Sequence, residues 1–228
     1  MIETKLATEL PLSIFMSEVS DGNMATHTGL DIAEVAQHRA ELVQRVGAPI
    51  QWLNQTHSAV VAAPQFVDAN PLDADGCIGR RGFAVGILTA DCLPVMLFSE
   101  SGLVYAGVHA GWRGLLDGIV INAVRQLKCP EGSRLRAFIG PSISQAAYQV
   151  ESDFVARFED RWERDLSECY TPDGKNHVRV DLAGLASMQL VELGIPCALS
   201  KLCTATDPRF FSYRENKTAG RIATVIGG

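Results

Sequence analysis

The sequence predicts an α/β fold in which mixed or antiparallel sheets are covered by helices. The apolar runs 83–88, 93–98 and 103–108 follow one another through short breaks, as adjacent strands joined by tight turns do. The helical segments do not alternate strictly with strands, and no glycine-rich phosphate fingerprint is present. A doubly wound parallel sheet is therefore less favoured than layers of strands buried on both faces.

The other elements follow from apolar spacing and from signals for helix ends. Asp31 is a good N-cap for a helix that Gly47 and Pro49 end. One further helix is expected after Gly111, with its buried face running from Leu115 to Leu127. Helices are also expected at 153–164 and from 181 to about 193, strands at 12–16, 50–56, 59–61, 135–139 and 178–180, short strands near 197 and 222, and a polar loop at 64–76.

Length and composition predict one domain over residues 1–228 with a core large enough to be stable by itself. Hydrophobic residues make up 47% of the chain and charged residues 20%, which excludes a disordered chain, a fibre and a coiled coil. The net charge of −6 argues against nucleic-acid or anionic-membrane partners. Without a signal peptide or an apolar run near the roughly 18 residues of a membrane helix, we expect a cytoplasmic protein with reduced cysteines.

Three side chains able to bind a metal lie at predicted strand ends: His57, Cys92 and His109. Two imidazoles and one thiolate suit zinc and leave a fourth tetrahedral position open. A metal in such a site polarises a carbonyl or phosphoryl group or lowers the pKa of bound water to about 7. Copper is an alternative, because this ligand set accepts both metals.

Two other interpretations of these residues stay open. Cys92 can be a nucleophile that His109 deprotonates, as in Cys–His hydrolases. Each residue taken singly is also a common component of a packed interior. Because ligand and nucleophile both require a thiolate near an imidazole, the sequence does not separate these roles.

Acidic and basic side chains near these positions are further candidates. Asp91 and Asp75 can serve as general acid or base if they face the metal, although an aspartate in a turn also binds its own backbone. Arg113 stands at a helix start, where an anion such as phosphate is favoured. His27 is expected to face solvent, and the segment 210–214 is expected to be core packing with an arginine-anchored turn.

Six segments together resemble a known family, and the resemblance runs from about Ile50 to Ile226. The segments are Asn54–Ser58, Thr89–Val95, Val108–Gly114, Ile139–Ile143, Phe211–Arg214 and Thr218–Arg221. The second and third are highly specific. The chain resembles the family once called multicopper polyphenol oxidases or laccase-domain proteins, which includes purine nucleoside phosphorylases and a peptidoglycan-editing factor.

The resemblance implies a single α/β domain of the cysteine-hydrolase-like type, with mixed sheets sandwiched between helices. It implies a zinc site of His57, Cys92 and His109. It also implies phosphorolysis of adenosine, inosine and methylthioadenosine to the free base and a pentose 1-phosphate, with adenosine deamination. Copper-dependent phenol oxidation is less favoured, because the chain lacks the His-x-His clusters that hold four coppers.

The chain departs from the family pattern after its first strand. Family members carry an arginine followed by paired glycines, and here Glu18 replaces the arginine while Ser20 replaces the first glycine. If the family arginine holds phosphate or nucleoside, Arg39 and Arg113 are the candidates to replace it. With Gln55 from the first motif, they are the expected substrate-binding residues.

The leading hypothesis is a zinc-dependent enzyme whose partners are a purine nucleoside and phosphate, with no nucleic acid and no membrane. Asp91 or Asp75 would move protons in deamination, and an arginine would hold phosphate in phosphorolysis. One alternative is a Cys92 amide hydrolase that edits a misincorporated amino acid in a peptidoglycan precursor. Another is a non-catalytic metal-binding partner protein. The sequence leaves the number of subunits open.

Overall fold

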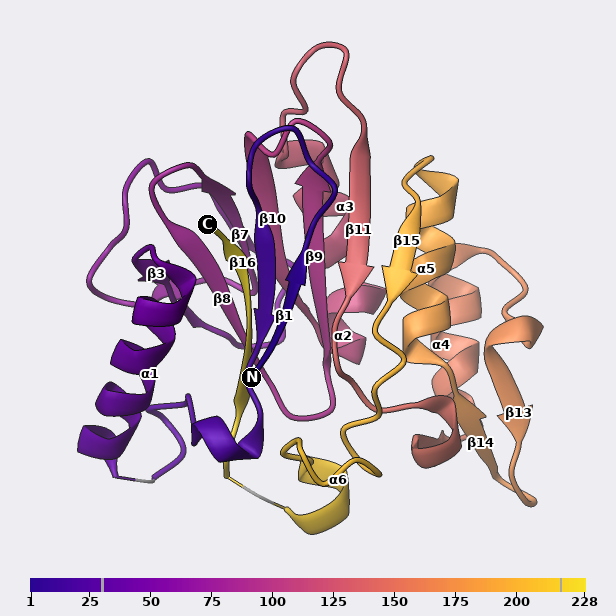
Figure 1. Ribbon diagram of the computed structural model, residues 1–228. Helices are drawn as coiled ribbons and strands as arrows, with labels where there is room; N and C mark the ends of the chain where they lie inside the picture. The colour runs from indigo at the N-terminus through magenta and orange to yellow at the C-terminus, as the bar shows by residue number, and fades with distance from the viewer. Residues whose placement is uncertain (30, 218) are drawn as a thin grey trace.

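Two sheets lie face to face between helices in the computed structural model, which describes residues 1–29, 31–217 and 219–228 (Figure 1). Thr218 of the last motif lies outside the described residues. The first sheet has the order β1 (Ile2–Lys5), β2 (Ser13–Met16), β16 (Ile222–Gly227), β8 (Ala84–Thr89) and β3 (Ile50–Gln51). The second has the order β15 (Cys197–Leu199), β11 (Leu135–Ile139), β9 (Leu93–Ser99), β10 (Val104–Ala110), β7 (Gly76–Arg80) and β5 (Val61–Ala62).

Both sheets mix parallel and antiparallel pairs, which confirms the predicted fold class. In the first sheet β3 pairs with β8 in parallel and β16 pairs with β8 antiparallel. In the second, β11 pairs with β15 in parallel and with β9 antiparallel. Two small sheets complete the fold: β12 (Gln149–Glu151), β14 (His177–Val180) and β13 (Tyr170–Pro172) form one, and β4 (Leu53–Asn54) and β6 (Leu72–Asp73) form the other.

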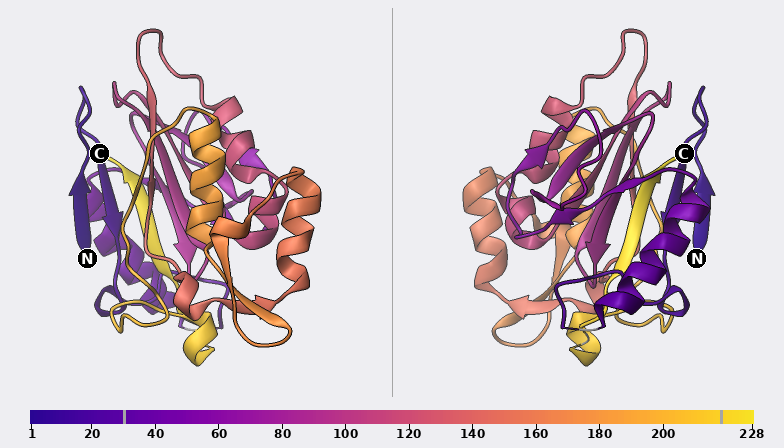
Figure 2. Two further views of the ribbon diagram at one scale, coloured as in Figure 1. Left: turned by 90° about the vertical axis from the view of Figure 1, so that its right-hand side faces the viewer. Right: turned by 90° about the vertical axis from the view of Figure 1, so that its left-hand side faces the viewer.

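Helices cover the outer faces of the two large sheets, as the two side views show (Figure 2). Helix α1 (Ile32–Val46) packs on the first sheet through Val46 and Leu42. The helices on the second sheet are α2 (Trp112–Leu116), α3 (Ile119–Gln126), α4 (Asp153–Trp162) and α5 (Leu182–Glu192). A short helix, α6 (Tyr213–Asn216), precedes β16. No helix of the described residues is long and apolar enough to span a bilayer.

The interior between the two sheets is filled by side chains from both. Ile87 of β8 and Met96 of β9 are fully buried there, and Tyr105 of β10 is 1% exposed. Gly107 permits the sheets to approach, because a Cβ at that position would lie 2.8 Å from Val85 Cγ1. Burial on both faces explains why these strands are continuous apolar runs in the sequence.

Several predicted elements are confirmed, and helix α1 is the clearest case. The Asp31 side chain accepts a hydrogen bond from the Ala33 N–H at 2.8 Å, as an N-cap does. Gly47 ends the helix in the left-handed conformation, with φ of 74°. The capping signals in the sequence therefore define both ends of this helix.

Three expectations were wrong in detail. The single helix expected after Gly111 is two helices, because the chain turns at Gly118 with φ of 84°. The strand expected over 50–56 is two short strands that join different partners, β3 with β8 and β4 with β6. The loop expected over 64–76 contains β6. In each case a tertiary pairing or a local turn interrupts a pattern that looked continuous.

The chain passes from one large sheet to the other between Thr89 and Leu93. Thr89 pairs with Ile222 in the first sheet, and Leu93 pairs with Ala110 in the second. The crossing residues include Asp91, whose φ of 93° lies in the left-handed region. The crossing therefore places residues 90–92 beside the end of β10.

Candidate functional site

The structure brings His57, Cys92 and His109 together from three separate parts of the chain. His57 follows β4, Cys92 lies in the crossing between β8 and β9, and His109 is near the end of β10. Their ligand atoms all lie within 4.8 Å of one another, and Cys92 Sγ is 3.8 Å from His57 Nε2. His109 is buried, while the other two are more accessible. The arrangement is a cluster of two imidazoles and one thiol.

Asp75 is the residue that holds both histidines in place. Its side chain is fully buried, and Oδ1 accepts from His109 Nδ1 at 2.8 Å and from the His57 N–H at 2.9 Å. The second oxygen, Oδ2, accepts from the Ser58 N–H and the Ser58 hydroxyl, both at 2.7 Å, and from the Thr56 N–H at 3.1 Å. Because Asp75 occupies Nδ1 of His109, Nε2 is the ring nitrogen left to face Cys92 or a metal.

The backbone of the loop that carries His57 is held in an unusual conformation. His57 has φ of 63°, which costs a non-glycine residue on the order of 1–3 kcal/mol. The hydrogen bonds from residues 56–58 to Asp75 stabilise this turn. Gly111 leaves the space that the cluster needs, because a Cβ there would lie 2.7 Å from His57 Cδ2 and 3.2 Å from Cys92 Sγ.

Charge interactions favour a thiolate and an imidazolium when no metal is bound. Burial alone would raise the pKa of the Cys92 thiol, but the charges and hydrogen bonds of His109 and His57 hold it well below its usual range. Burial alone would lower the pKa of His109, but the Cys92 charge and the hydrogen bond to Asp75 raise it. Metal binding needs the same thiolate, so the protein already favours the ionised form of this ligand.

We expect Cys92 in metal-free protein to react with iodoacetamide at pH values where a free thiol, of pKa about 8.5, is mostly protonated. Its lowered pKa means that the thiolate persists as the pH falls from 8 toward 6. Peptide mass spectrometry would follow alkylation at each pH. Buried Cys77, whose pKa burial raises to about 12, is the unreactive internal control. A rate that falls in step with the titration of a free thiol would contradict the expectation.

Both carboxylate oxygens of Asp91 accept hydrogen bonds from the C-terminal segment that lines the site, so neither oxygen is left without a partner. Oδ1 accepts from the Thr204 and Ser212 hydroxyls at 2.7 and 2.8 Å, and Oδ2 accepts from the Arg214 N–H at 2.7 Å. These bonds join the crossing loop to the C-terminal segment more than 110 residues away in sequence. Asp91 therefore fixes the start of α6 beside the cluster.

A cavity of about 350 Å³ opens on the three-residue cluster. Its volume falls within the about 300–1,000 Å³ that is typical of small-molecule sites. Besides the cluster and Asp91, it is lined by the aromatic side chains of Trp112, Tyr148 and Tyr213. The basic side chains that line it are His27, Arg214 and Arg221.

Several of these lining residues were missed by sequence reasoning. The expectation that 210–214 is core packing is correct for Phe210, which is buried, and wrong for Tyr213 and Arg214, which line the cavity. Tyr148 has no signal in the sequence beyond its aromatic character. Burial and the negative charge of Cys92 raise its pKa to about 12, so its phenol remains a hydrogen-bond donor.

The three expected substrate-binding residues lie in different places. Gln55 lines the cavity, and its amide exchanges hydrogen bonds with the Leu88 backbone at 2.8 and 2.9 Å. Arg113 is exposed, with its guanidinium 4.7 Å from the Trp112 ring centre, and Arg39 donates from Nε to the Met24 carbonyl at 2.8 Å. Neither arginine belongs to the described residues that line the cavity.

Glu18, which stands where the family pattern has arginine, has structural partners in this chain. It pairs with the N-terminal ammonium of Met1 at 2.6 Å and with Arg209 at 3.4 Å. Asp21 also pairs with the Met1 ammonium, at 2.9 Å. The acids of this turn are therefore occupied by cations outside the cavity.

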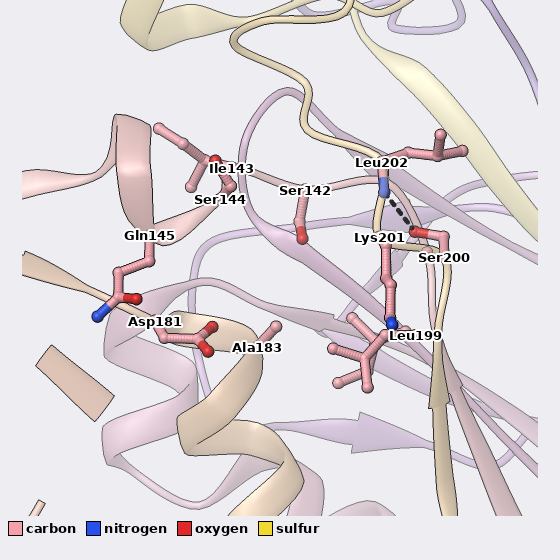
Figure 3. A pocket seen from close by; sticks show the side chains of 12 residues that line it. Ser142, Ile143, Ser144, Gln145, Asp181, Ala183, Leu199, Ser200, Lys201 and Leu202 are labelled. Atoms are coloured by element: carbon pink, nitrogen blue, oxygen red, sulfur yellow. Dashed lines mark hydrogen bonds between the residues drawn. The ribbon is translucent and has the colours of Figure 1, made fainter. Parts of the chain in front are cut away.

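A second cavity of about 240 Å³ lies next to the first, and Ile143 lines both. In Figure 3, Gln145 and Asp181 lie on one side of it and Leu199, Ser200 and Lys201 on the other, with Ser142 between them. None of its described lining residues belongs to the cluster. The chemistry of the cluster is therefore directed to the first cavity.

The chain is similar to several known proteins over most of its length. A purine nucleoside phosphorylase of Xylella fastidiosa is 36% identical over 204 residues, covering 84% of this chain and 77% of the relative. One from Mycobacterium bovis is 32% identical over 213 residues, covering 90% and 83%. A crystal structure of a Neisseria meningitidis protein has a TM-score of 0.89 at 29% identity and covers 100% of this chain and 99% of its own.

The family comparison covers nearly the whole chain. The model described as multi-copper polyphenol oxidoreductase laccase matches residues 14–228. This range includes the cluster, Asp75 and every residue named above as lining the first cavity. The chain therefore belongs to the multi-copper polyphenol oxidoreductase laccase family.

Proposed function

We propose that this protein is a zinc-dependent purine nucleoside phosphorylase. The observation that carries the proposal is the cluster of His57, Cys92 and His109, held by buried Asp75 and open to a cavity with aromatic and cationic walls. Its relatives named purine nucleoside phosphorylase are 31–36% identical over most of their length. The substrate class is taken from these relatives, and the site chemistry from this chain.

The residues of the cluster fit a zinc ion. Two imidazole nitrogens and a thiolate are a soft-to-borderline donor set, and the carboxylate on His109 supplies the partner that metal-binding histidines usually have. Copper is compatible with the same donors. When bound, the metal supplies Lewis acidity toward a phosphoryl or carbonyl oxygen. The chain's part is to present these donors in a fixed geometry beside the cavity.

The cavity walls suit the two parts of a phosphorolysis reaction. Trp112, Tyr148 and Tyr213 offer aromatic faces and edges for a purine, and arginines offer paired donors for phosphate. In phosphorolysis, a phosphate oxygen bonds to the anomeric carbon while the bond from that carbon to the purine nitrogen breaks. The purine leaves with the electron pair and takes up a proton. The walls therefore offer places for both substrates beside the cluster, so that the reacting atoms can be held close to one another.

We also propose that adenosine is deaminated in the same cavity. The protonated phenol of Tyr148 is one donor beside the cluster, and Asp91 holds the chain segment that carries Tyr213. Asp75 is buried behind His109 with both oxygens engaged, so we assign it to orienting the histidines rather than to moving protons to the substrate.

Incubation with adenosine and phosphate tests the proposal directly. We expect adenine and ribose 1-phosphate from phosphorolysis, and inosine or hypoxanthine if deamination also occurs, all separated by chromatography. Omitting phosphate should remove only the phosphorolysis products. The absence of adenine, inosine and hypoxanthine at high concentrations of zinc-loaded protein would overturn the proposal, and bound metal without turnover would favour a non-catalytic metal-binding protein.

A second candidate function is supported by three side chains that contact one another in turn: Cys92 interacts with His109, and His109 is hydrogen-bonded to Asp75. A thiol, an imidazole and a buried carboxylate in this order match the arrangement of a Cys–His nucleophile with an orienting acid. This candidate is an amide hydrolase for a peptidoglycan precursor. It predicts activity in metal-free protein that alkylation of Cys92 abolishes, and a thioester that can be trapped. The zinc enzyme instead loses activity when the metal is removed.

A further inference from the structure

Three basic side chains, His27, Arg39 and Arg221, gather beside the first cavity, and we call them the basic wall. His27 and Arg221 line the cavity directly. Arg39 is joined to them through Met24, whose carbonyl accepts from Arg39 Nε at 2.8 Å while its N–H donates to the Arg221 carbonyl at 3.0 Å. The start of β16 and the loop before α1 therefore meet here, at the lower end of the molecule in Figure 1.

The loop that carries His27 is built to hold this position. Asn23 is 8% exposed, and its Oδ1 accepts from the Arg221 N–H at 2.8 Å and from the Ala25 N–H at 3.0 Å. Its Nδ2 donates to the Ala25 carbonyl at 2.9 Å. Met24 and Ala25 are each 1% exposed, so the segment just before His27 is anchored in the interior.

The basic wall gathers positive charge beside the cavity, because the charges of Arg221 and Arg39 both act on His27. None of the ion pairs among the described residues includes Arg39. Arg39 lies over the Trp52 ring at 4.1 Å, and its partial burial lowers its pKa to about 10. Burial and the charges of Arg221 and Arg39 also lower the pKa of His27. Glu18 and Asp21, the two acidic residues that come shortly before His27 in the sequence, are paired with the Met1 ammonium.

A site with this charge balance favours an anion. The two guanidinium charges disfavour a charged imidazole nearby, and an anion bound beside Arg221 and His27 would offset that repulsion. Phosphate suits the position because a guanidinium can donate two parallel hydrogen bonds to its oxygens. A neutral His27 can add one N–H donor.

We propose that His27 and Arg221 form the phosphate subsite of the cavity and that Arg39 positions them. Resting on the proposed phosphorylase function, this inference identifies the wall that holds the second substrate. Arg221 and His27 contact phosphate, while Arg39 acts through Met24 and through its charge. The aromatic side chains Trp112, Tyr148 and Tyr213 are then left for the nucleoside.

The experiment is a calorimetric titration of the zinc-loaded full chain with inorganic phosphate. In Arg221→Gln and His27→Gln we expect phosphate affinity to fall at least about tenfold, as loss of a charge-assisted hydrogen bond predicts. Arg39→Gln should cause a smaller loss, and inosine affinity in phosphate-free buffer should stay within twofold of the wild type. Arg45→Gln is the matched control, because Arg45 lies on the same helix but pairs with Asp21.

Two further readouts separate this inference from the proposed function. The NMR titration of the His27 ring should show a higher pKa with phosphate than with sodium chloride at equal ionic strength, whether or not any nucleoside is turned over. In active protein, the variants should raise KM for phosphate and leave KM for the nucleoside unchanged. Wild-type phosphate affinity in folded Arg221→Gln and His27→Gln would overturn the subsite, even if phosphorolysis is established.

A phosphate monoester offers the same chemistry from another source, so adenosine 5′-monophosphate is titrated in parallel. Phosphate binding that the variants weaken supports the subsite for the second substrate. Tight monophosphate binding, with no inorganic phosphate bound at millimolar concentrations, would overturn it. Because Arg221 also donates to the Ala219 and Gly220 carbonyls, the exposed His27 provides the variant least able to disturb folding.

Discussion

Replacing Asp75 with asparagine should lower the free energy of unfolding by about 3–5 kcal/mol, the cost of removing one partner from a buried charged pair. Asparagine can supply one acceptor oxygen, but its NH₂ group would face donors that now point at a carboxylate. These donors are the Thr56, His57 and Ser58 N–H groups, the Ser58 hydroxyl and His109 Nδ1. Metal affinity should also fall about 10–100-fold, because both histidines lose their orienting partner.

Urea unfolding at several pH values would measure this effect. Burial alone would raise the pKa of Asp75, but hydrogen bonds from His109 and Ser58 hold it well below its usual range. Its contribution is therefore present above the ordinary aspartate pKa of about 4 and is lost as the pH falls through the lowered value in the folded protein. The difference between wild type and Asp75→Asn should shrink in acid.

Asp73→Asn is the matched control for this experiment. Asp73 is two residues away, exposed, and accepts one hydrogen bond from Asn54 at 2.8 Å. We expect this variant to unfold within about 0.5 kcal/mol of the wild type, as exposed substitutions usually do. Equal stability of Asp75→Asn and Asp73→Asn at neutral pH would contradict the central role of Asp75.

Replacing Cys92 with serine should abolish stable metal binding and, with it, the proposed phosphorolysis. A serine hydroxyl is far less acidic than a thiol and its oxygen is a harder donor, so it does not supply the thiolate that zinc and copper favour. Elemental analysis after dialysis should find about one ion per chain in the wild type and close to none in Cys92→Ser. His57→Ala should give the same result, because it removes a second donor of the cluster.

Cys129→Ser is the control, because Cys129 lies outside the cluster and donates to the Ser133 carbonyl. It should keep both metal and activity. Full metal content in an inactive Cys92→Ser protein would contradict the ligand role and support Cys92 as a nucleophile. Circular dichroism of each variant would establish that loss of metal does not reflect loss of the fold.

The cluster could be predicted from sequence because its members share one property. His57, Cys92 and His109 interrupt or end apolar runs, and the end of a buried strand is where a side chain can reach a cavity. Spacing could not show that Cys92 belongs to a crossing between two sheets. That position depends on the pairing of Thr89 with Ile222 and of Leu93 with Ala110.

The role of Asp75 could not be resolved from sequence. An aspartate beside glycine is typical of a turn, and a turn aspartate binds neighbouring backbone. Here its partners are Thr56, His57 and Ser58, which are 17–19 residues earlier, and His109, which is 34 residues later. No local pattern encodes contacts at these separations. The same holds for Tyr213 and Arg214, which Asp91 fixes from more than 120 residues away.

The sequence by itself determined the fold class, the capped helix α1 and the three residues able to bind a metal, because apolar periodicity, end signals and side-chain chemistry are local properties. Only the tertiary structure decided which side chains share the cavity and where positive charge gathers. It placed His27 and Arg221 on the cavity and left Arg113 exposed. The reason is physical: strand pairing and buried hydrogen bonds such as those of Asp75 join distant segments, and only the folded chain brings them into contact.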